Sequence, residues 1–213
     1  MAASEKSTGL SDEERQAMAE GARWLFGYGS ILWKNDEVKS RFPVRMAGLR
    51  GYKRRFWQGS PDHRGTPEAP GRTVTLLPVD VLREKDPHCA EEEDDALVHG
   101  AATLVEKKDH GDVFGVLDHR EKAGYERRDI KVELDDGSML EAVTYVATHT
   151  NEHFLGPSSS IDEVAQHISR SEGPSGPNWE YLRNLALHLK KRGVRDAHVE
   201  ALWDRVEKLV SSG

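Results

Sequence analysis

The sequence predicts an α+β fold around a mixed β-sheet or small barrel. Segments typical of strands and of amphipathic helices follow one another without the regular strand–helix alternation of parallel α/β proteins. The 213 residues suffice to bury a core within one domain, and they show no internal repeat. We therefore expect one domain over residues 23–213, preceded by an N-terminal tail and a short helix over residues 1–22.

The first elements lead into a glycine turn. Ser11 and Glu14 have the spacing of a capping box, which predicts a short helix that ends near Ala22. Residues 24–26, Trp-Leu-Phe, are typical of a buried strand. The next four residues, Gly27 to Ser30, predict a tight turn that leaves backbone N–H groups bare for a carboxylate or an oxyanion.

Two neighbouring strands are predicted over residues 49–58 and 72–79. The segment between them, residues 59–71, carries three prolines and three glycines, so we expect a long loop that binds or covers something. Our hypothesis is that residues 60–71 act as a lid. Residues 84–97 contain five consecutive acidic residues, Glu91 to Asp95, and predict a solvated insertion.

The second half of the chain adds a strand, a helix, a hairpin and three further helices. These elements are expected over residues 100–106, 109–120, 129–147, 160–173, 178–192 and 196–210. In the helix over residues 109–120, Val113, Val116 and Leu117 have the spacing of a buried face. Gly124 suits the position that ends this helix, which places Glu121 in its last turn.

Composition limits the classes of function. The net charge of −7 argues against broad nucleic-acid binding, and no apolar run approaches the roughly 20 residues of a membrane helix. The single cysteine, Cys89, excludes an intrachain disulfide, and residues 1–8 lack the apolar centre of a signal peptide. We therefore expect a cytoplasmic protein with no cofactor, no metal site, and no nucleic-acid or membrane partner.

The glycine turn allows more than one interpretation. Gly27 to Ser30 is a poor dinucleotide fingerprint, because Leu32 stands at the third glycine position, and an ordinary turn after a buried strand remains open. A serine-hydrolase site is also disfavoured, since Ser175 lacks the pattern of a nucleophile elbow.

The charged candidates also have two interpretations each. Glu121 either belongs to a charged helix face or exchanges protons, since the helix dipole disfavours charge on a carboxylate at a helix C-terminus. Arg54, Arg55 and Arg64 either form a solvated strand face or clamp a small anion, because a guanidinium group binds a carboxylate through two hydrogen bonds.

Six short motifs occur in order along the chain. They are Trp24 to Ile31, Leu49 to Tyr52, Ser60 to Pro67, Arg120-Glu121 with Gly124-Tyr125, Thr144 to Ala147, and Gly173 to Asn178. Together they resemble the ChaC-like γ-glutamylcyclotransferases. The resemblance implies a small mixed β-barrel with flanking helices, which agrees with the fold expected from the residues. The acidic insertion and the N-terminal helix depart from the family pattern.

The resemblance also implies an activity and a set of site residues. It implies an enzyme that cleaves glutathione into 5-oxoproline and cysteinylglycine, with Glu121 as the catalytic acid and base. The substrate-binding residues that it implies are Leu25, Phe26, Gly27, Tyr28, Gly29, Ser30, Ile31 and Tyr145. For the glycine carboxylate of the substrate we expect a clamp from Arg54, Arg55 or Arg64.

Two alternatives stay open on the sequence. One is a cyclotransferase for other γ-glutamyl amino acids or γ-glutamylamines. The other is a non-catalytic module in which the turn holds a ligand and the insertion or the helical tail recruits a protein partner.

Overall fold

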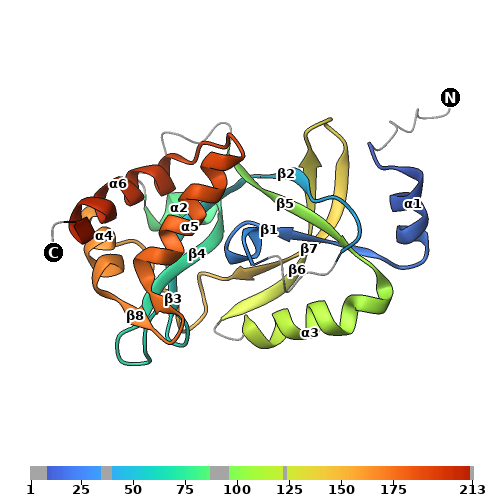
Figure 1. Cartoon of the computed structure of the whole chain (residues 1–213). Coiled ribbons are helices and arrows are strands. Elements are labelled where there is room, and N and C mark those ends of the chain that lie inside the picture. Colours follow the sequence, from blue (N-terminus) through green and yellow to red (C-terminus); the bar gives the residue numbers. More distant parts are fainter. Residues whose placement is uncertain (1–8, 35–39, 87–95, 122–123, 212–213) are drawn as a thin grey trace. The chain divides into compact units, whose positions relative to one another are not determined.

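A computed structural model describes residues 9–34, 40–86, 96–121 and 124–211 (Figure 1). The chain forms two compact units, each assembled from separate stretches of sequence. The first unit contains residues 1–50, 97–120 and 127–145, and the second contains residues 51–96, 121–126 and 146–213. The single domain expected over residues 23–213 stays a prediction.

Five strands form a closed barrel, which lies almost wholly in the first unit. In barrel order they are β1 (Arg23–Gly27), β5 (Leu97–Val105), β2 (Arg45–Arg50), β6 (Tyr125–Leu134) and β7 (Met139–Ala147). Strand β1 pairs antiparallel with β5 and parallel with β7, so the barrel is mixed. Trp24, Leu25 and Phe26 are at most 1% exposed, and because successive side chains point to opposite faces of a strand, both faces of β1 are covered. The predicted α+β fold with a mixed barrel is confirmed.

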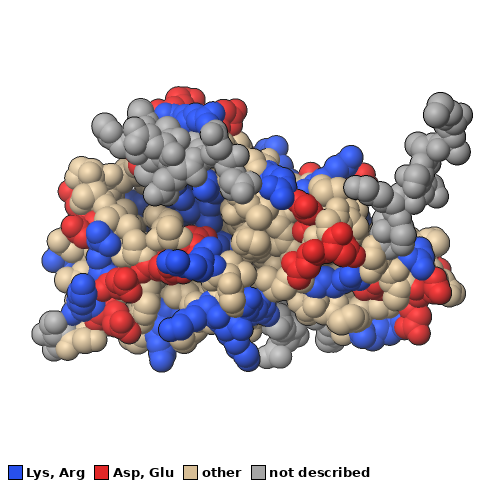
Figure 2. Space-filling model, turned by 90° about the horizontal axis from the view of Figure 1, so that it is seen from above, with Lys and Arg blue, Asp and Glu red and all other residues tan. Residues whose placement is uncertain are grey.

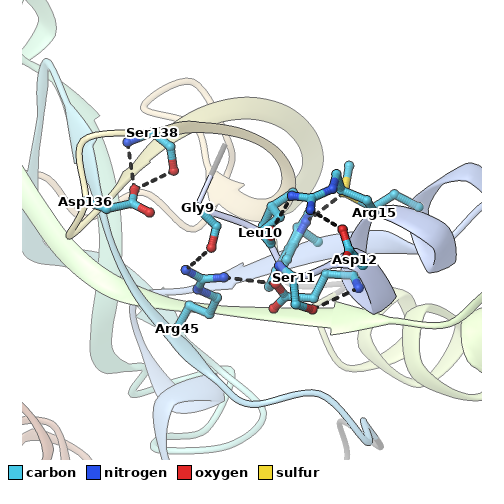
Figure 3. A network of polar contacts seen from close by, with 11 residues as sticks. Gly9, Leu10, Ser11, Asp12, Arg15, Arg45, Asp136 and Ser138 are labelled. Atoms are coloured by element: carbon cyan, nitrogen blue, oxygen red, sulfur yellow. Dashed lines mark hydrogen bonds and ion pairs between the residues drawn. The ribbon is translucent and has the colours of Figure 1, made fainter. Parts of the chain in front are cut away.

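Helix α1 (Asp12–Ala19) begins with the predicted capping box. The hydroxyl of Ser11 accepts from the backbone N–H of Glu14, and the Glu14 carboxylate accepts from the N–H of Ser11 at 2.7 Å. Arg45 of β2 donates to the Glu14 carboxylate at 2.9 Å and to the carbonyl of Gly9 at 2.8 Å (Figure 3). These contacts attach the start of α1 to the barrel. The helix ends at Ala19, before the predicted Ala22.

Helix α3 (His110–Arg120) follows the short 3₁₀ helix η4 (Lys107–Asp109). Val113, Phe114 and Leu117 are buried, whereas Val116 is 48% exposed. The predicted core position of Val116 is therefore wrong. At about 100° per residue, Val116 points away from the centre of the face formed by the three buried residues.

The second unit contains a two-stranded antiparallel sheet of β3 (Tyr52–Ser60) and β4 (Gly71–Pro78). The single strand predicted over residues 49–58 is wrong, because β2 ends at Arg50 and β3 begins at Tyr52. Between them Gly51 has a φ of +78°, a left-handed conformation that interrupts a strand. The two pieces belong to different sheets.

Helices and a small hairpin complete the second unit. They are α2 (Val79–Lys85), α4 (Ile161–Arg170), β8 (Glu172–Gly173), β9 (Gly176–Pro177), α5 (Asn178–Lys191) and α6 (Ala197–Ser211). The buried faces of α4, α5 and α6 include Val164, Leu185 and Leu202, respectively. The three helices pack together, as the spacing of their apolar residues predicts. Helix α2 was not predicted, and the acidic run Glu91 to Asp95 lies outside the described residues.

Acidic and basic side chains are interspersed over the face seen in Figure 2. Among the described helices, none combines the length and the apolar character that crossing a membrane requires.

Candidate active site

The glycine turn follows β1 directly. Strand β1 ends at Gly27, Tyr28 and Gly29 form a bend, and the 3₁₀ helix η1 (Ser30–Leu32) begins at once. A Cβ atom on Gly27 would lie 2.7 Å from Cγ2 of Ile31. Because this is closer than carbon atoms approach, only glycine fits here without a shift of Ile31. The predicted tight turn is present.

Three consecutive backbone N–H groups are open in this turn. Among the described residues, the N–H groups of Gly29, Ser30 and Ile31 have no hydrogen-bond acceptor. The first hydrogen bonds of η1 come later, from Leu32 N to Gly29 O at 2.9 Å and from Trp33 N to Ser30 O at 3.1 Å. Successive unpaired amide donors at the start of a helical turn can bind an oxyanion or a carboxylate.

The side chain of Ser30 is bonded to α3. The Nη2 atom of Arg120, the last residue of α3, donates to Oγ of Ser30 at 2.8 Å. This contact suits a residue that positions the turn, and it occupies the hydroxyl with a cationic donor.

Strand β7 holds the other side of the turn. The hydroxyl of Tyr28 is buried and donates to the carbonyl of Tyr145 at 2.7 Å. One residue earlier on β7, the hydroxyl of Thr144 donates to the carbonyl of Phe26 at 2.8 Å. The backbone of the turn is thus fixed from both Phe26 and Tyr28.

The hydroxyl of Tyr145 is directed to α3. It donates to Oδ1 of Asp118 at 2.6 Å and lies 3.4 Å from the carbonyl of Phe114. Burial raises the pKa of the Tyr145 hydroxyl well above its usual value, and the neighbouring Asp118 carboxylate raises it further. At neutral pH Tyr145 therefore keeps its proton and acts as a donor. Its predicted contact with substrate stays a prediction.

Helix α3 ends at Arg120, as predicted, so Glu121 is the first residue after the helix and not part of its last turn; it belongs to the second unit. Its carbonyl accepts from Tyr125 N at 3.3 Å. The hydroxyl of Tyr125 donates to the carbonyl of Val74 on β4 at 2.7 Å. Gly124 has a φ of +85°, and a Cβ there would lie 2.3 Å from Oδ1 of Asn151. These contacts hold Gly124 and Tyr125 in place, and the catalytic role of Glu121 stays a prediction.

Two of the three predicted clamp arginines have internal carboxylate partners. Arg54, whose side chain is 1% exposed, lies 2.5 Å from Asp196. Arg64 donates to the carbonyl of Pro177 at 2.9 Å and lies 3.3 Å from Glu180.

Arg55 differs from them. Its Nη1 donates to the carbonyl of Arg54 at 3.0 Å. Its other guanidinium nitrogens have no acceptor within the part of the chain that the structure describes.

The comparison with known proteins identifies the family. Residues 23–209 match the family model described as ChaC-like protein. The chain belongs to this family. Gamma-glutamylcyclotransferase 2-3 of Arabidopsis thaliana is 36% identical over 198 residues, which cover 89% of this chain and 91% of the relative. The glutathione-specific gamma-glutamylcyclotransferase of Saccharomyces cerevisiae is 33% identical over 226 residues, with 87% and 96% covered.

A solved structure has the same fold. The crystal structure of a selenomethionine-labelled γ-glutamylcyclotransferase specific to glutathione, from yeast, has a TM-score of 0.78 and 30% sequence identity. The match covers 88% of this chain and 96% of that chain. The resemblance seen in the sequence motifs is thereby confirmed.

The loop predicted as a lid in this ChaC-like chain has a defined internal structure. Thr66 and Ala69 exchange backbone hydrogen bonds of 3.0 and 3.2 Å, and the hydroxyl of Ser60 accepts from Arg64 N at 3.1 Å. The carbonyl of His63 accepts from Ser175 N at 2.9 Å. These bonds give the loop a defined structure, and its action as a lid stays a prediction.

One spacing was overlooked in the sequence. His149 and His153 form a His-x-x-x-His pair, yet residues 149–153 are a turn, so the pair does not lie on one helical face. Within the described residues, no group of three or more His, Cys, Asp or Glu side chains is arranged to hold a metal ion.

Sequence reasoning also missed several residues around the ChaC-like turn. Arg120 and Thr144 lie inside motifs that signalled the family, so proximity to those motifs was an available signal. Asp118 lies outside all six motifs, and its partner Tyr145 follows it by 27 residues. Only the packing of α3 against the barrel brings the two together.

Proposed function

We propose that the protein cyclises the γ-glutamyl group of glutathione and releases 5-oxoproline and cysteinylglycine. The observation that carries the proposal is the turn after β1, where the open N–H groups of Gly29, Ser30 and Ile31 follow one another. The names of the yeast and plant relatives support the choice of a γ-glutamyl substrate, and of glutathione in particular. A chain with one cysteine suits a reducing compartment, so we propose the cytoplasm as its location.

The reaction needs no nucleophile from the protein. The α-amino nitrogen of the γ-glutamyl group attacks its own γ-carbonyl carbon and closes a five-membered ring. Because both reacting groups belong to one molecule, binding in a bent conformation supplies most of the entropic advantage. The bond between the γ-carbonyl and the cysteine nitrogen then breaks.

Glu121 transfers the proton. The α-amino group is an ammonium ion at neutral pH and cannot attack until it loses a proton, which the Glu121 carboxylate accepts. The same group returns this proton to the cysteine nitrogen as it leaves. The attacking nitrogen loses a second proton when it becomes the ring amide, and the released cysteine amine takes up one proton to become an ammonium ion, so the net proton count is unchanged. General acid–base catalysis of this kind contributes a rate factor of about 10² to 10⁴.

The turn stabilises the tetrahedral oxyanion. As the amine attacks, the γ-carbonyl oxygen becomes negatively charged, and the N–H groups of Gly29, Ser30 and Ile31 are the donors that we assign to it. One fixed donor typically lowers such a barrier by about 3 kcal/mol. Since the donors belong to the backbone, they need no reorientation during the reaction.

Of the three arginines, Arg55 is the one that we assign to the glycine carboxylate. Arg54 and Arg64 already pair with Asp196 and Glu180, and moving them would leave those carboxylates without their cations. Arg55 retains donors that no described residue uses.

Incubation with glutathione tests the proposal. We expect 5-oxoproline and cysteinylglycine to appear in equal amounts, while γ-glutamyl-alanine is turned over much more slowly. Equal rates for the two substrates would favour a general γ-glutamyl enzyme. No product from either, with glutathione binding retained, would favour a non-catalytic binding module.

A further inference from the structure

We infer that Asp118 and Arg120 of α3 are positioning residues that hold the turn after β1 through a ring of hydrogen bonds. The inference deepens the proposed function and rests on it. It also gives Tyr145 a role beyond lining the site, because the hydroxyl of Tyr145 is one link of the ring.

Three hydrogen bonds close the ring. Tyr28 of the turn donates to the carbonyl of Tyr145 at 2.7 Å, and the hydroxyl of Tyr145 donates to Asp118 at 2.6 Å. Arg120 lies two residues after Asp118 on α3. It donates to Ser30 of the turn at 2.8 Å, and this third bond closes the ring. All five residues lie in the first unit.

Each bond has features of a strong link. The Tyr28–Tyr145 bond is buried, so water does not compete for its donor or acceptor. The other two join a neutral hydroxyl to the charged groups of Asp118 and Arg120, and hydrogen bonds to charged groups are roughly twice as strong as neutral ones.

The ring fixes the residues on both sides of Gly29. A glycine has more backbone freedom than any other residue, so the N–H groups of Gly29, Ser30 and Ile31 need external support to converge on one oxygen. The ring provides it at Tyr28 and at Ser30. Because Glu121 directly follows Arg120, the same bond restrains the backbone from which Glu121 projects.

The Asp118–Arg127 ion pair lies outside the ring. The two atoms are 3.3 Å apart, and the side chains are 50% and 47% exposed. A half-exposed pair is screened by water and contributes little. Arg127 also interacts with the hydroxyl of Tyr145, so it offers a control that contacts two residues of the ring without being one of its links.

Steady-state kinetics on substituted proteins test the ring. We expect Tyr145→Phe and Asp118→Ala each to lower kcat for glutathione about tenfold, with KM within about twofold of the wild type, because misaligned donors weaken transition-state binding more than substrate binding. The double variant is expected to lose no more than the worse single variant, since both remove one bond. Asp118→Asn keeps an acceptor and should retain most of kcat, and Arg127→Gln should match the wild type.

The Arg120–Ser30 bond is tested by a double-mutant cycle of its own. Arg120→Gln and Ser30→Ala are expected to lower kcat by similar factors that do not multiply in the double variant. If the losses in kcat multiply in both double variants, or if only KM changes, the inference that the ring positions the turn is wrong. If Asp118→Ala does not fold, the kinetics of the Tyr145→Phe and Arg120→Gln variants still test the ring.

Hydrogen exchange separates failure of the ring from failure of the proposed function. In Tyr145→Phe, the hydrogen-bonded amides of Leu32 and Trp33 should exchange about tenfold faster than in the wild type, whether or not glutathione is turned over. A wild-type protein without turnover contradicts the proposed function alone. Unchanged exchange together with unchanged kcat contradicts the ring alone.

Discussion

Arg120 Nη2 and Ser30 Oγ lie 2.8 Å apart and join residues separated by ninety positions in the chain. Arg120 ends α3, and Ser30 begins η1. The bond therefore links the residue that precedes Glu121 to the turn with the open N–H groups. It connects the two motifs to which the proposed chemistry assigns the proton transfer and the oxyanion.

Replacement of Glu121 tests the proton transfer. Glu121→Gln preserves the size of the side chain and removes its ability to accept a proton, so kcat for glutathione should fall at least a hundredfold. KM should change little, because the substrate contacts of the turn remain. Production of 5-oxoproline measures the loss. On α6, the exposed Glu207→Gln serves as a control with wild-type kinetics, and a fully active Glu121→Gln protein would rule out this residue as the acid and base.

Replacement of Gly27 tests the geometry of the turn. In Gly27→Ala the added Cβ would lie 2.7 Å from Ile31, so the turn must shift. We expect kcat/KM for glutathione to fall at least tenfold, since small misplacements of binding groups are costly in rate. Kinetics and a thermal melt measure the effect.

A second glycine provides the matched control. Gly115 lies within α3, and a Cβ there would meet no atom within 4 Å. Gly115→Ala should leave kcat/KM unchanged and stabilise the protein by about 0.5–1 kcal/mol, because alanine favours the helix. Equal kinetic losses in both glycine variants would contradict the special role of Gly27.

Local causes explain what was predictable in the fold. The capping box of Ser11, the buried strand before Gly27 and the hairpin before Ala147 each depend on neighbours in sequence, and all three are present. The strand break at Gly51 was missed because glycine also occurs within strands, and its φ of +78° is set by the path of the chain between two sheets.

Tertiary contacts explain what was not predictable in the site. The side-chain pair Tyr145–Asp118 and the ion pair Arg54–Asp196 join residues far apart in sequence, so no spacing rule connects them. Arg54 on a strand rich in charge looked like a solvated residue or a clamp. Its burial against the start of α6 follows only from helix packing.

The clamp arginines can be distinguished by comparing stability with substrate affinity. Arg54→Met leaves the Asp196 carboxylate without its cation, and loss of one partner of a buried ion pair typically lowers the free energy of unfolding by about 3–5 kcal/mol. Arg55→Met should lower it much less and should instead raise KM for glutathione about tenfold. Urea denaturation and steady-state kinetics measure both quantities. An unchanged KM in Arg55→Met would remove Arg55 from the clamp.

The stability of the second unit should fall in acid because a neutral histidine is buried in it. His198 Nε2 accepts from Phe56 N at 3.4 Å, which requires the unprotonated nitrogen. Burial lowers the pKa of His198 to about 3, and the nearby charge of Arg55 adds to this shift. Burial also lowers the pKa of His167. The hydrogen bond to the carbonyl of Pro70 raises this pKa, and the charge of Arg72 lowers it further.

The sign of the pH dependence follows from proton binding. In the unfolded chain a histidine takes up its proton near pH 6.5, whereas folded His198 does so only near pH 3. Between these values the unfolded state binds more protons, so the free energy of unfolding decreases as the pH falls from about 6.5 towards 3. Burial alone would raise the pKa of Asp196, but Arg54 and His198 lower it, so this carboxylate adds a further loss only in more acidic solution.

Urea denaturation at pH 7, 6, 5 and 4 measures this slope. His198→Gln keeps a hydrogen-bond acceptor for Phe56 N and has no proton to gain in this range, so its free energy of unfolding should depend less on pH than that of the wild type. The wild type loses more of its free energy of unfolding with each pH unit below about 6.5. Plots of this free energy against pH for the wild type and for His198→Gln should therefore converge or cross below pH 6. Parallel curves from pH 7 to pH 4 would mean that His198 is protonated alike in the folded and unfolded states, and the acid sensitivity would then have to come from other groups.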